Sequence, residues 1–286
     1  MNPLSRRRER WAEHEAAIYR DGFRAGLRKG RRKPRPRDAY RYVFVVAYGR
    51  SGSTLVQGLL NVMPRTLVRG ENNFYLLELF HALEAVREFR RIHLHHETRK
   101  VTSAFYGLHA FRPRPFVQAA NDVVTWSVVG DLRARDYDVL GFKEVLWHRI
   151  TPEETELFFE FMDLAFPGVG YVLNTRDPAT TVGSGFWTGL PREEALAAIS
   201  RVREIQDHLR VTRPDRVVEV EYETLTGGDP EQVDGLLERL AEFTTGRPAT
   251  PELMAGLRGA LSVGHGPNPF GQRRADTLPP ERAKPE

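Results

Sequence analysis

The stretch VFVVAYGRSGSTLVQGLLNVMP, residues 43–64, decides the fold. Five apolar residues at 43–47 predict a buried strand, because a short run without polar residues fits the interior of a sheet. A helix is expected from Ser53 to Pro64, since proline disfavours helical geometry in the residue before it. Between the two lies GRSGST, residues 49–54. A strand, a glycine-containing turn and a helix start together predict backbone N–H groups that bind an anion.

This turn differs from the loop of nucleoside triphosphatases, G-x-x-x-x-G-K-[ST]. There the lysine reaches the outer phosphates and the hydroxyl holds magnesium. Aligned on Gly52, the chain has Ala47 in place of the first glycine and Ser53 in place of the lysine. No strand ends in an aspartate suited to magnesium, since YVLNTRD places Arg176 before Asp177. We therefore expect an anion site without a metal, with Arg50 as its cation.

Beyond residue 40, predicted strands and helices alternate. The strands lie near residues 42–47, 65–68, 139–142, 170–174 and 216–220, and the helices near residues 53–63, 74–91, 152–165, 178–186, 192–209 and 230–243. This alternation predicts an α/β fold: a parallel sheet of about five strands, like that of P-loop nucleoside triphosphatases, with helices on both faces. The span 91–138 has mixed character, and we expect it to build the substrate side of a site.

A second stretch, YVLNTRDPATTVGSGFW at residues 171–187, predicts another anion contact. Asp177 suits a helix N-cap and Pro178 the first helical position. Arg176 precedes this helix and Ser184 lies about two turns inside it, so a guanidinium and a hydroxyl can converge on one anion. Ligands of open α/β sheets bind outside the carboxyl ends of the strands. We expect this pair and the loop at 49–54 to face one crevice.

Composition sets limits on location. With 286 residues and 41% hydrophobic content, the chain can bury a large core. It has no cysteine, which excludes disulfides, thiolate catalysis and cysteine-based metal sites. No apolar run approaches the roughly 18–20 residues that span a bilayer, and the start of the chain lacks the apolar stretch of a signal peptide. A cytoplasmic location is the expectation.

The basic residues are concentrated at one end. Residues 1–40 hold 13 Lys and Arg against five Asp and Glu, whereas the remainder holds 29 against 33. We therefore divide the chain into a basic N-terminal arm at 1–40, an α/β domain at 41–263, and a C-terminal loop and tail at 264–286. Because the domain is net negative, we expect no specific nucleic-acid partner, and at most a weak anionic partner for the arm.

Four segments together resemble the PAPS-dependent sulfotransferases. GRSGSTL is similar to the RSGST form of bacterial and Golgi carbohydrate members, and Arg176 with Ser184 repeats the spacing of the family's 3′-phosphate site. GFKE at 141–144 resembles a strand common in bacterial members, and VEVEYETL at 218–225 resembles the family's RYEDL segment, with Glu221 in place of the usual arginine. The resemblance covers about residues 41–225.

This resemblance implies a donor, 3′-phosphoadenosine 5′-phosphosulfate (PAPS), and a product, adenosine 3′,5′-bisphosphate. A sulfuryl group would pass by in-line displacement, without a metal, to a hydroxyl or an amine of a small-molecule, lipid or carbohydrate acceptor. The transferred group carries one negative charge, against about two for a terminal phosphoryl group, so N–H dipoles and one or two cations can meet the demand. The residues implied in binding the donor are Arg50, Ser51, Gly52, Ser53, Thr54, Arg176 and Ser184.

The resemblance also implies a catalytic base. In some members a glutamate after the second strand has this role, which corresponds to Glu71. Arg50 would supply electrostatic stabilisation, and Lys143 would reach the bridging oxygen. An alternative has Glu71 capping the helix at Phe74 or pairing with Arg69.

Other readings stay open at this point. Glu144 is the next candidate for the base, followed by His93, His95 and His96, and Lys143 with Glu144 would alternatively form a surface pair. An ATP- and magnesium-dependent small-molecule kinase, or a non-catalytic phosphate-binding module, would use the same loop. No motif identifies the acceptor.

Overall fold

The computed structural model describes residues 40–94, 96–130, 132–183 and 185–262, all of which belong to one compact unit, Arg37–Glu286. Ser184, His95, the arm before Tyr40 and the tail predicted from residue 264 lie outside the described residues.

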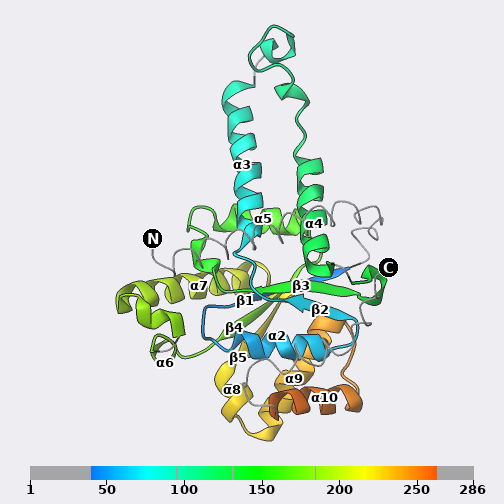
Figure 1. Ribbon diagram of the computed structural model, residues 1–286, viewed down its shortest axis with the longest axis vertical. Coiled ribbons are helices and arrows are strands. Elements are labelled where there is room, and N and C mark those ends of the chain that lie inside the picture. The colour runs from blue at the N-terminus through cyan, green and yellow to red at the C-terminus, as the bar shows by residue number, and fades with distance from the viewer. Residues whose placement is uncertain (1–39, 95, 131, 184, 263–286) are drawn as a thin grey trace, which may run out of the picture. The chain divides into compact units, whose positions relative to one another are not determined.

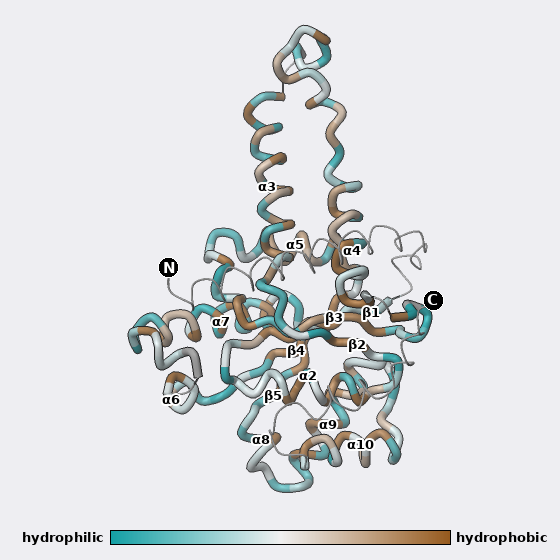
Figure 2. Tube along the Cα trace, in the orientation of Figure 1, coloured by the Kyte–Doolittle hydropathy of each residue, from teal (hydrophilic) through white to brown (hydrophobic). Residues whose placement is uncertain are grey.

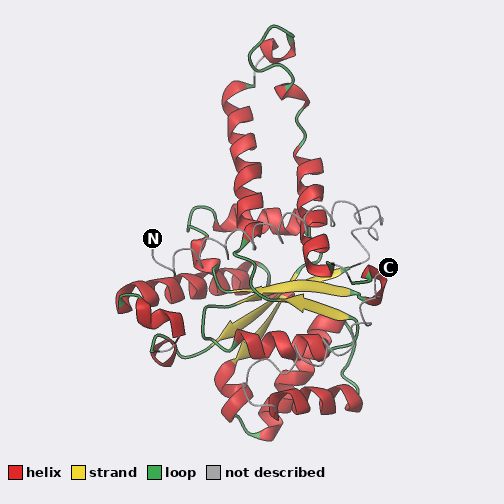
Figure 3. Cartoon of the chain, in the orientation of Figure 1, coloured by secondary structure: helices red, strands yellow, loops and turns green. Residues whose placement is uncertain are grey.

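The described chain contains one five-stranded sheet whose paired strands all run parallel (Figure 3). The strand order is β2 (Thr66–Arg69), β3 (Val139–Glu144), β1 (Arg41–Val46), β4 (Gly170–Thr175) and β5 (Val217–Glu221). The predicted fold class is confirmed. The three central strands are almost entirely buried, as expected of strands covered on both faces.

Helices cover both faces of the sheet (Figure 1). One face carries α2 (Ser53–Val62), α8 (Tyr222–Gly227), α9 (Pro230–Thr245) and α10 (Pro251–Ser262), and the other carries α3 (Tyr75–His93), α4 (Pro113–Val129), α5 (Thr155–Ala165) and α7 (Arg192–Thr212). Side chains alternate along β1, so Phe44 joins the core under α5 and Val45 the core under α2. The strands accordingly colour as mainly hydrophobic in Figure 2.

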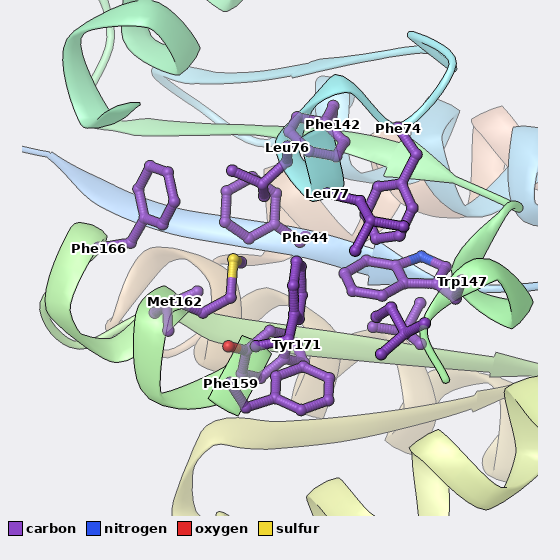
Figure 4. Close-up of a cluster of buried hydrophobic side chains, with 14 of the residues drawn as sticks. Phe44, Phe74, Leu76, Leu77, Phe142, Trp147, Phe159, Met162, Phe166 and Tyr171 are labelled. Carbon is purple, nitrogen blue, oxygen red and sulfur yellow. The ribbon is translucent and has the colours of Figure 1, made fainter. Parts of the chain in front are cut away.

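Aromatic rings form much of the core on the α5 face (Figure 4). The rings of Phe44 and Phe142 lie 4.6 Å apart, and those of Phe74 and Trp147 lie 4.8 Å apart. All four side chains are completely buried. This packing supports the segment that leads from β2 into α3.

The predicted length of one helix is wrong. The helix expected over residues 178–186 ends as α6 (Pro178–Thr181), and a 3₁₀ segment follows at Gly185–Gly189. Glycine is a poor helix former, and residues 183–185 read Gly-Ser-Gly.

Three α-helices in the described part of the chain were not predicted. Of these, α4 lies in the span of mixed character and packs against α3, while α8 and α10 follow β5 and α9. No helix among the described residues is long and apolar enough to cross a bilayer.

Candidate active site

The loop between β1 and α2 has an unusual backbone. Arg50 and Gly52 have φ angles of 67° and 83°, in the left-handed region. A Cβ atom on Gly52 would lie 2.1 Å from the ring of Tyr222, so only glycine fits beneath this ring. The sequence RSGS thus builds a turn that no other residue at position 52 would allow.

This turn presents N–H groups at the start of α2. Ser51 N–H bonds to the carbonyl of Tyr48 at 3.2 Å, but no side chain caps the helix. Among the described residues, nothing accepts a hydrogen bond from the N–H groups of Ser53 and Thr54. Together with the helix dipole, such N–H groups can bind an anion, and the anion site at this loop stays a prediction.

Hydrogen bonds from buried polar side chains fix the loop between β1 and α2. Ser51 Oγ donates to Asn174 Oδ1 at 2.8 Å, and Trp187 Nε1 donates to the carbonyl of Gly49 at 2.7 Å. Gln206 Nε2 donates to the carbonyls of Val46 and Asn174. Because Ser51 is fully buried, its hydroxyl supports the shape of the loop.

Arg176 connects the two predicted phosphate contacts. Its Nη1 donates to the carbonyl of Arg50 at 3.0 Å, and its guanidinium lies 4.3 Å from the centroid of the Tyr222 ring. Its backbone N–H donates to the hydroxyl of Tyr48 at 2.8 Å. Its Nε is buried without a hydrogen-bond partner among the described residues.

The helix after Arg176 begins as predicted. Asp177 caps α6 by accepting hydrogen bonds from the N–H groups of Ala179 at 3.0 Å and Thr180 at 3.1 Å. These bonds hold the pKa of Asp177 below its ordinary value. The carboxylate is thereby used for structure.

A pocket of about 340 Å³ lies beside Arg176 at the carboxyl ends of β4 and β5. Its walls come from the β4–α6 connection, from α7 and from the end of β5. The lining residues are Thr175, Arg176, Asp177, Pro178, Arg203, Asp207, Arg210, Glu221 and Glu223. The lining includes Arg176 but no residue of the loop at 49–54, so a crevice that both segments face stays a prediction.

Glu71 and Lys143 form an ion pair at the carboxyl ends of β2 and β3. The Lys143 side chain is 6% exposed and that of Glu71 50% exposed, so the carboxylate is open to solvent while the ammonium lies beneath it. Arg69 bonds instead to the carbonyl of Val128, and Glu71 pairs with Lys143. The alternative pairing of Glu71 with Arg69 is therefore wrong.

Glu144 is fully buried, and its carboxylate accepts four backbone hydrogen bonds. The alternative of a surface pair between Lys143 and Glu144 is wrong, because both side chains point into the protein on opposite faces of β3.

The candidate base His93 lies elsewhere. His93 is the last residue of α3, and Tyr75, just after the turn that follows Glu71, is the first. The two lie on the order of 27 Å apart along the helix axis. Its ring stacks on Phe105 at 4.4 Å. Within the described parts of the chain, no group of three His, Asp or Glu side chains is arranged to hold a metal ion.

Some contributors to the site carried little signal in the sequence. Tyr222 lies in the quoted segment VEVEYETL, but its packing over Gly52 depends on the order of the strands. Tyr48 follows the strand as an apparently ordinary aromatic residue. Gln206 lies in the middle of α7, where nothing but its burial distinguishes it from a surface glutamine.

Comparison with known proteins identifies the family. The model of the sulfotransferase family matches residues 42–242, so the chain belongs to the sulfotransferase family and is a transferase. The chain is also similar to a solved structure, sulfotransferase STF9 from Mycobacterium avium, at 14% identity and a TM-score of 0.41, with 84% of this chain and 77% of that chain covered. The chain matches none of the curated proteins.

Proposed function

We propose that this sulfotransferase takes its sulfuryl group from PAPS and transfers it to a hydroxyl, or an amine, of a small-molecule, lipid or carbohydrate acceptor. The observation that carries the proposal is the hydrogen bond from Arg176 to the carbonyl of Arg50, 3.0 Å long. This bond supports the proposal because it brings a second cation directly beside the loop, and PAPS has phosphate groups at two positions.

The residues present fit such a donor. Arg176 Nε is buried without a described partner, and a phosphate oxygen is a natural acceptor for it. The N–H groups of Ser53 and Thr54, with the side chains of Arg50 and Thr54, would hold the 5′-phosphosulfate. Ser51 and Gly52 would shape that loop. Ser184, outside the described residues, stays a predicted second contact to the 3′-phosphate.

Two side chains have the chemistry for the transfer itself. When bound, PAPS supplies an activated sulfuryl group on a nucleotide leaving group. Glu71, the more exposed partner of the ion pair, would accept the proton of the acceptor hydroxyl. As Glu71 takes up the proton, its ion pair with Lys143 would break. The ammonium of Lys143 would then balance negative charge on the departing oxygen, together with Arg50 and the N–H groups of α2.

Thermal unfolding with added ligands tests the choice of donor. Adenosine 3′,5′-bisphosphate at about 100 times its dissociation constant should stabilise the protein by about 2.7 kcal/mol, a clear rise in Tm. ATP with magnesium serves as the comparison. Stabilisation by ATP with magnesium but not by the bisphosphate would instead favour the kinase. Stabilisation by inorganic phosphate as large as that by the bisphosphate would favour a simple phosphate-binding module.

Turnover then distinguishes an enzyme from a binding module. Release of the bisphosphate from PAPS should depend on an acceptor, tested with a panel of phenols, monosaccharides and glycolipids. The acceptor with the highest rate serves as the probe in the experiments below.

A further inference from the structure

Glu144 is a buried carboxylate with an unusual set of partners. Its Oε2 accepts hydrogen bonds from the N–H groups of Asn72 at 3.2 Å and Phe74 at 2.9 Å. Its Oε1 accepts from those of Val145 at 2.8 Å and Leu146 at 3.2 Å. Among the described residues no Lys or Arg side chain pairs with it, and all four of these hydrogen-bond donors are backbone N–H groups.

The turn that Glu144 holds is strained. Asn73 and Phe74 have φ angles of 60° and 53°, which places two successive non-glycine residues in the left-handed region. Side chains other than glycine rarely adopt this conformation, and it persists only where surrounding contacts enforce it. Successive N–H groups in such a turn converge on one point, which suits an anion. The carboxylate of Glu144 occupies that point.

The aromatic core fixes the other side of this turn. The Phe74 ring is fully buried and lies beside that of Trp147 (Figure 4). The two ring centroids are 4.8 Å apart, and the centroid of the Phe158 ring lies 5.7 Å from that of Phe74. Trp147 is itself tied to the end of β3, because its Nε1 donates to the carbonyl of Glu144 at 3.0 Å. The turn and the strand end therefore form one connected unit.

This unit carries the ion pair of the proposed site. Glu71 directly precedes the turn, and Lys143 directly precedes Glu144 in β3. We propose that Glu144 is a positioning residue: by holding the strained turn at 72–74 it fixes Glu71 opposite Lys143. The inference rests on the proposed function, in which Glu71 is the base. A displacement of about 1 Å in a catalytic group can lower turnover by about 100-fold.

Substitution at Glu144 tests this role. Glu144→Gln replaces one acceptor oxygen by an NH₂ group that faces two backbone donors, so about half of the hydrogen bonds are lost. Glu144→Asp keeps the charge but draws the carboxylate back by about 1.5 Å, and serves if the glutamine variant does not fold. Glu84→Gln is the matched control, because Glu84 is a carboxylate on α3 that pairs with Arg87.

The expected result combines three measurements. Turnover should fall by roughly 10- to 100-fold in Glu144→Gln, while affinity for the bisphosphate changes by less than about twofold. The backbone amides of Asn72 and Phe74 should exchange hydrogen faster in Glu144→Gln than in wild type, and this measurement does not depend on activity. In a Glu71→Gln background, Glu144→Gln should lower turnover no further, because it acts through Glu71.

Two outcomes would overturn the inference. One is an equal fall in turnover in the wild-type and Glu71→Gln backgrounds, which would show that Glu144 does not act through Glu71. The other is unchanged exchange at residues 72 and 74. Full turnover in Glu71→Gln alone would overturn the choice of base instead, and the exchange measurement still reports whether Glu144 holds the turn.

Discussion

Arg176 Nη1 bonds to the backbone carbonyl of Arg50 at 3.0 Å, although 126 residues separate the two in sequence. The parallel pairing of β1 with β4 makes this possible, because it brings the loop after each strand to the same edge of the sheet. The Tyr48 hydroxyl strengthens the connection by bonding to the backbone of Arg176. The two predicted anion contacts thus form a single structural unit.

Arg176→Ala should weaken binding of adenosine 3′,5′-bisphosphate by about 1.5–3 kcal/mol, the range for a hydrogen bond to a charged group. Isothermal titration calorimetry measures this, with far-UV circular dichroism expected to stay unchanged. Adenosine 5′-phosphosulfate lacks the 3′-phosphate, so its affinity should hardly change. Arg216→Ala, at the amino end of β5, is the control. Equal losses for both ligands would count against the assignment.

Ser51→Ala should destabilise the protein by about 1–3 kcal/mol, because Asn174 Oδ1 would be left buried without its donor. Urea unfolding measures this as a lower midpoint. The exposed Thr54 provides the contrast: Thr54→Ala should change stability by less than about 0.5 kcal/mol and instead weaken binding of the bisphosphate. If Ser51→Ala proves as stable as wild type, the bond to Asn174 does not anchor the loop.

The sequence predicted the sheet because its strands are short apolar runs bounded by turn residues. All five strands lie within two residues of the expected positions. The α4 helix was missed since the surrounding span mixes His, Arg and aromatic residues, and its apolar face becomes evident only where Val117, Val124 and Val128 meet the core. Local composition does not reveal such tertiary contacts.

The site was predictable where it follows one continuous segment. The loop at 49–54 and the cap at Asp177 depend on neighbouring residues, and both match the structure. The Glu71 ion pair and the buried Glu144 depend instead on the pairing of β2 with β3. The sequence placed Lys143 next to Glu144 but gave no means to tell which face of the strand each would occupy.

Deletion of residues 2–39 should leave turnover of a small acceptor unchanged. The described residues contain both hydrophobic clusters and the whole sheet, so the domain has its own core. Any loss should be confined to large anionic acceptors and should fade as salt rises, because screening weakens attraction between exposed charges. Steady-state kinetics at about 50 and 300 mM salt provide the measurement. A loss with small neutral acceptors would show that the domain boundary is misplaced.

Stability should depend on pH through His148. Burial lowers the pKa of this histidine below its ordinary value of 6.5. The unfolded chain therefore binds the proton first as pH falls, so the contribution of neutral His148 is complete above pH 6.5 and is lost below it. Urea unfolding at several pH values between about 8 and 5 should show a smaller loss of stability in His148→Gln than in wild type. Identical slopes would contradict the prediction.

Glu71 and Lys143 should have separable effects on turnover. Glu71→Gln keeps the shape and hydrogen bonding of the side chain but removes the proton acceptor, so turnover should fall by roughly 10²–10⁴-fold while bisphosphate binding persists. Lys143→Gln removes the charge that we propose faces the leaving group, and it leaves Glu71 without this partner. Lys143 would act on the leaving oxygen. The fall in turnover of Lys143→Gln should therefore be smaller with a donor analogue that has a better leaving group, whereas the fall in turnover of Glu71→Gln should be the same with both donors. Single-turnover kinetics of the two variants with both donors measure this. If Glu71→Gln lowers turnover by less than about tenfold with the donor still bound, Glu71 is not the base.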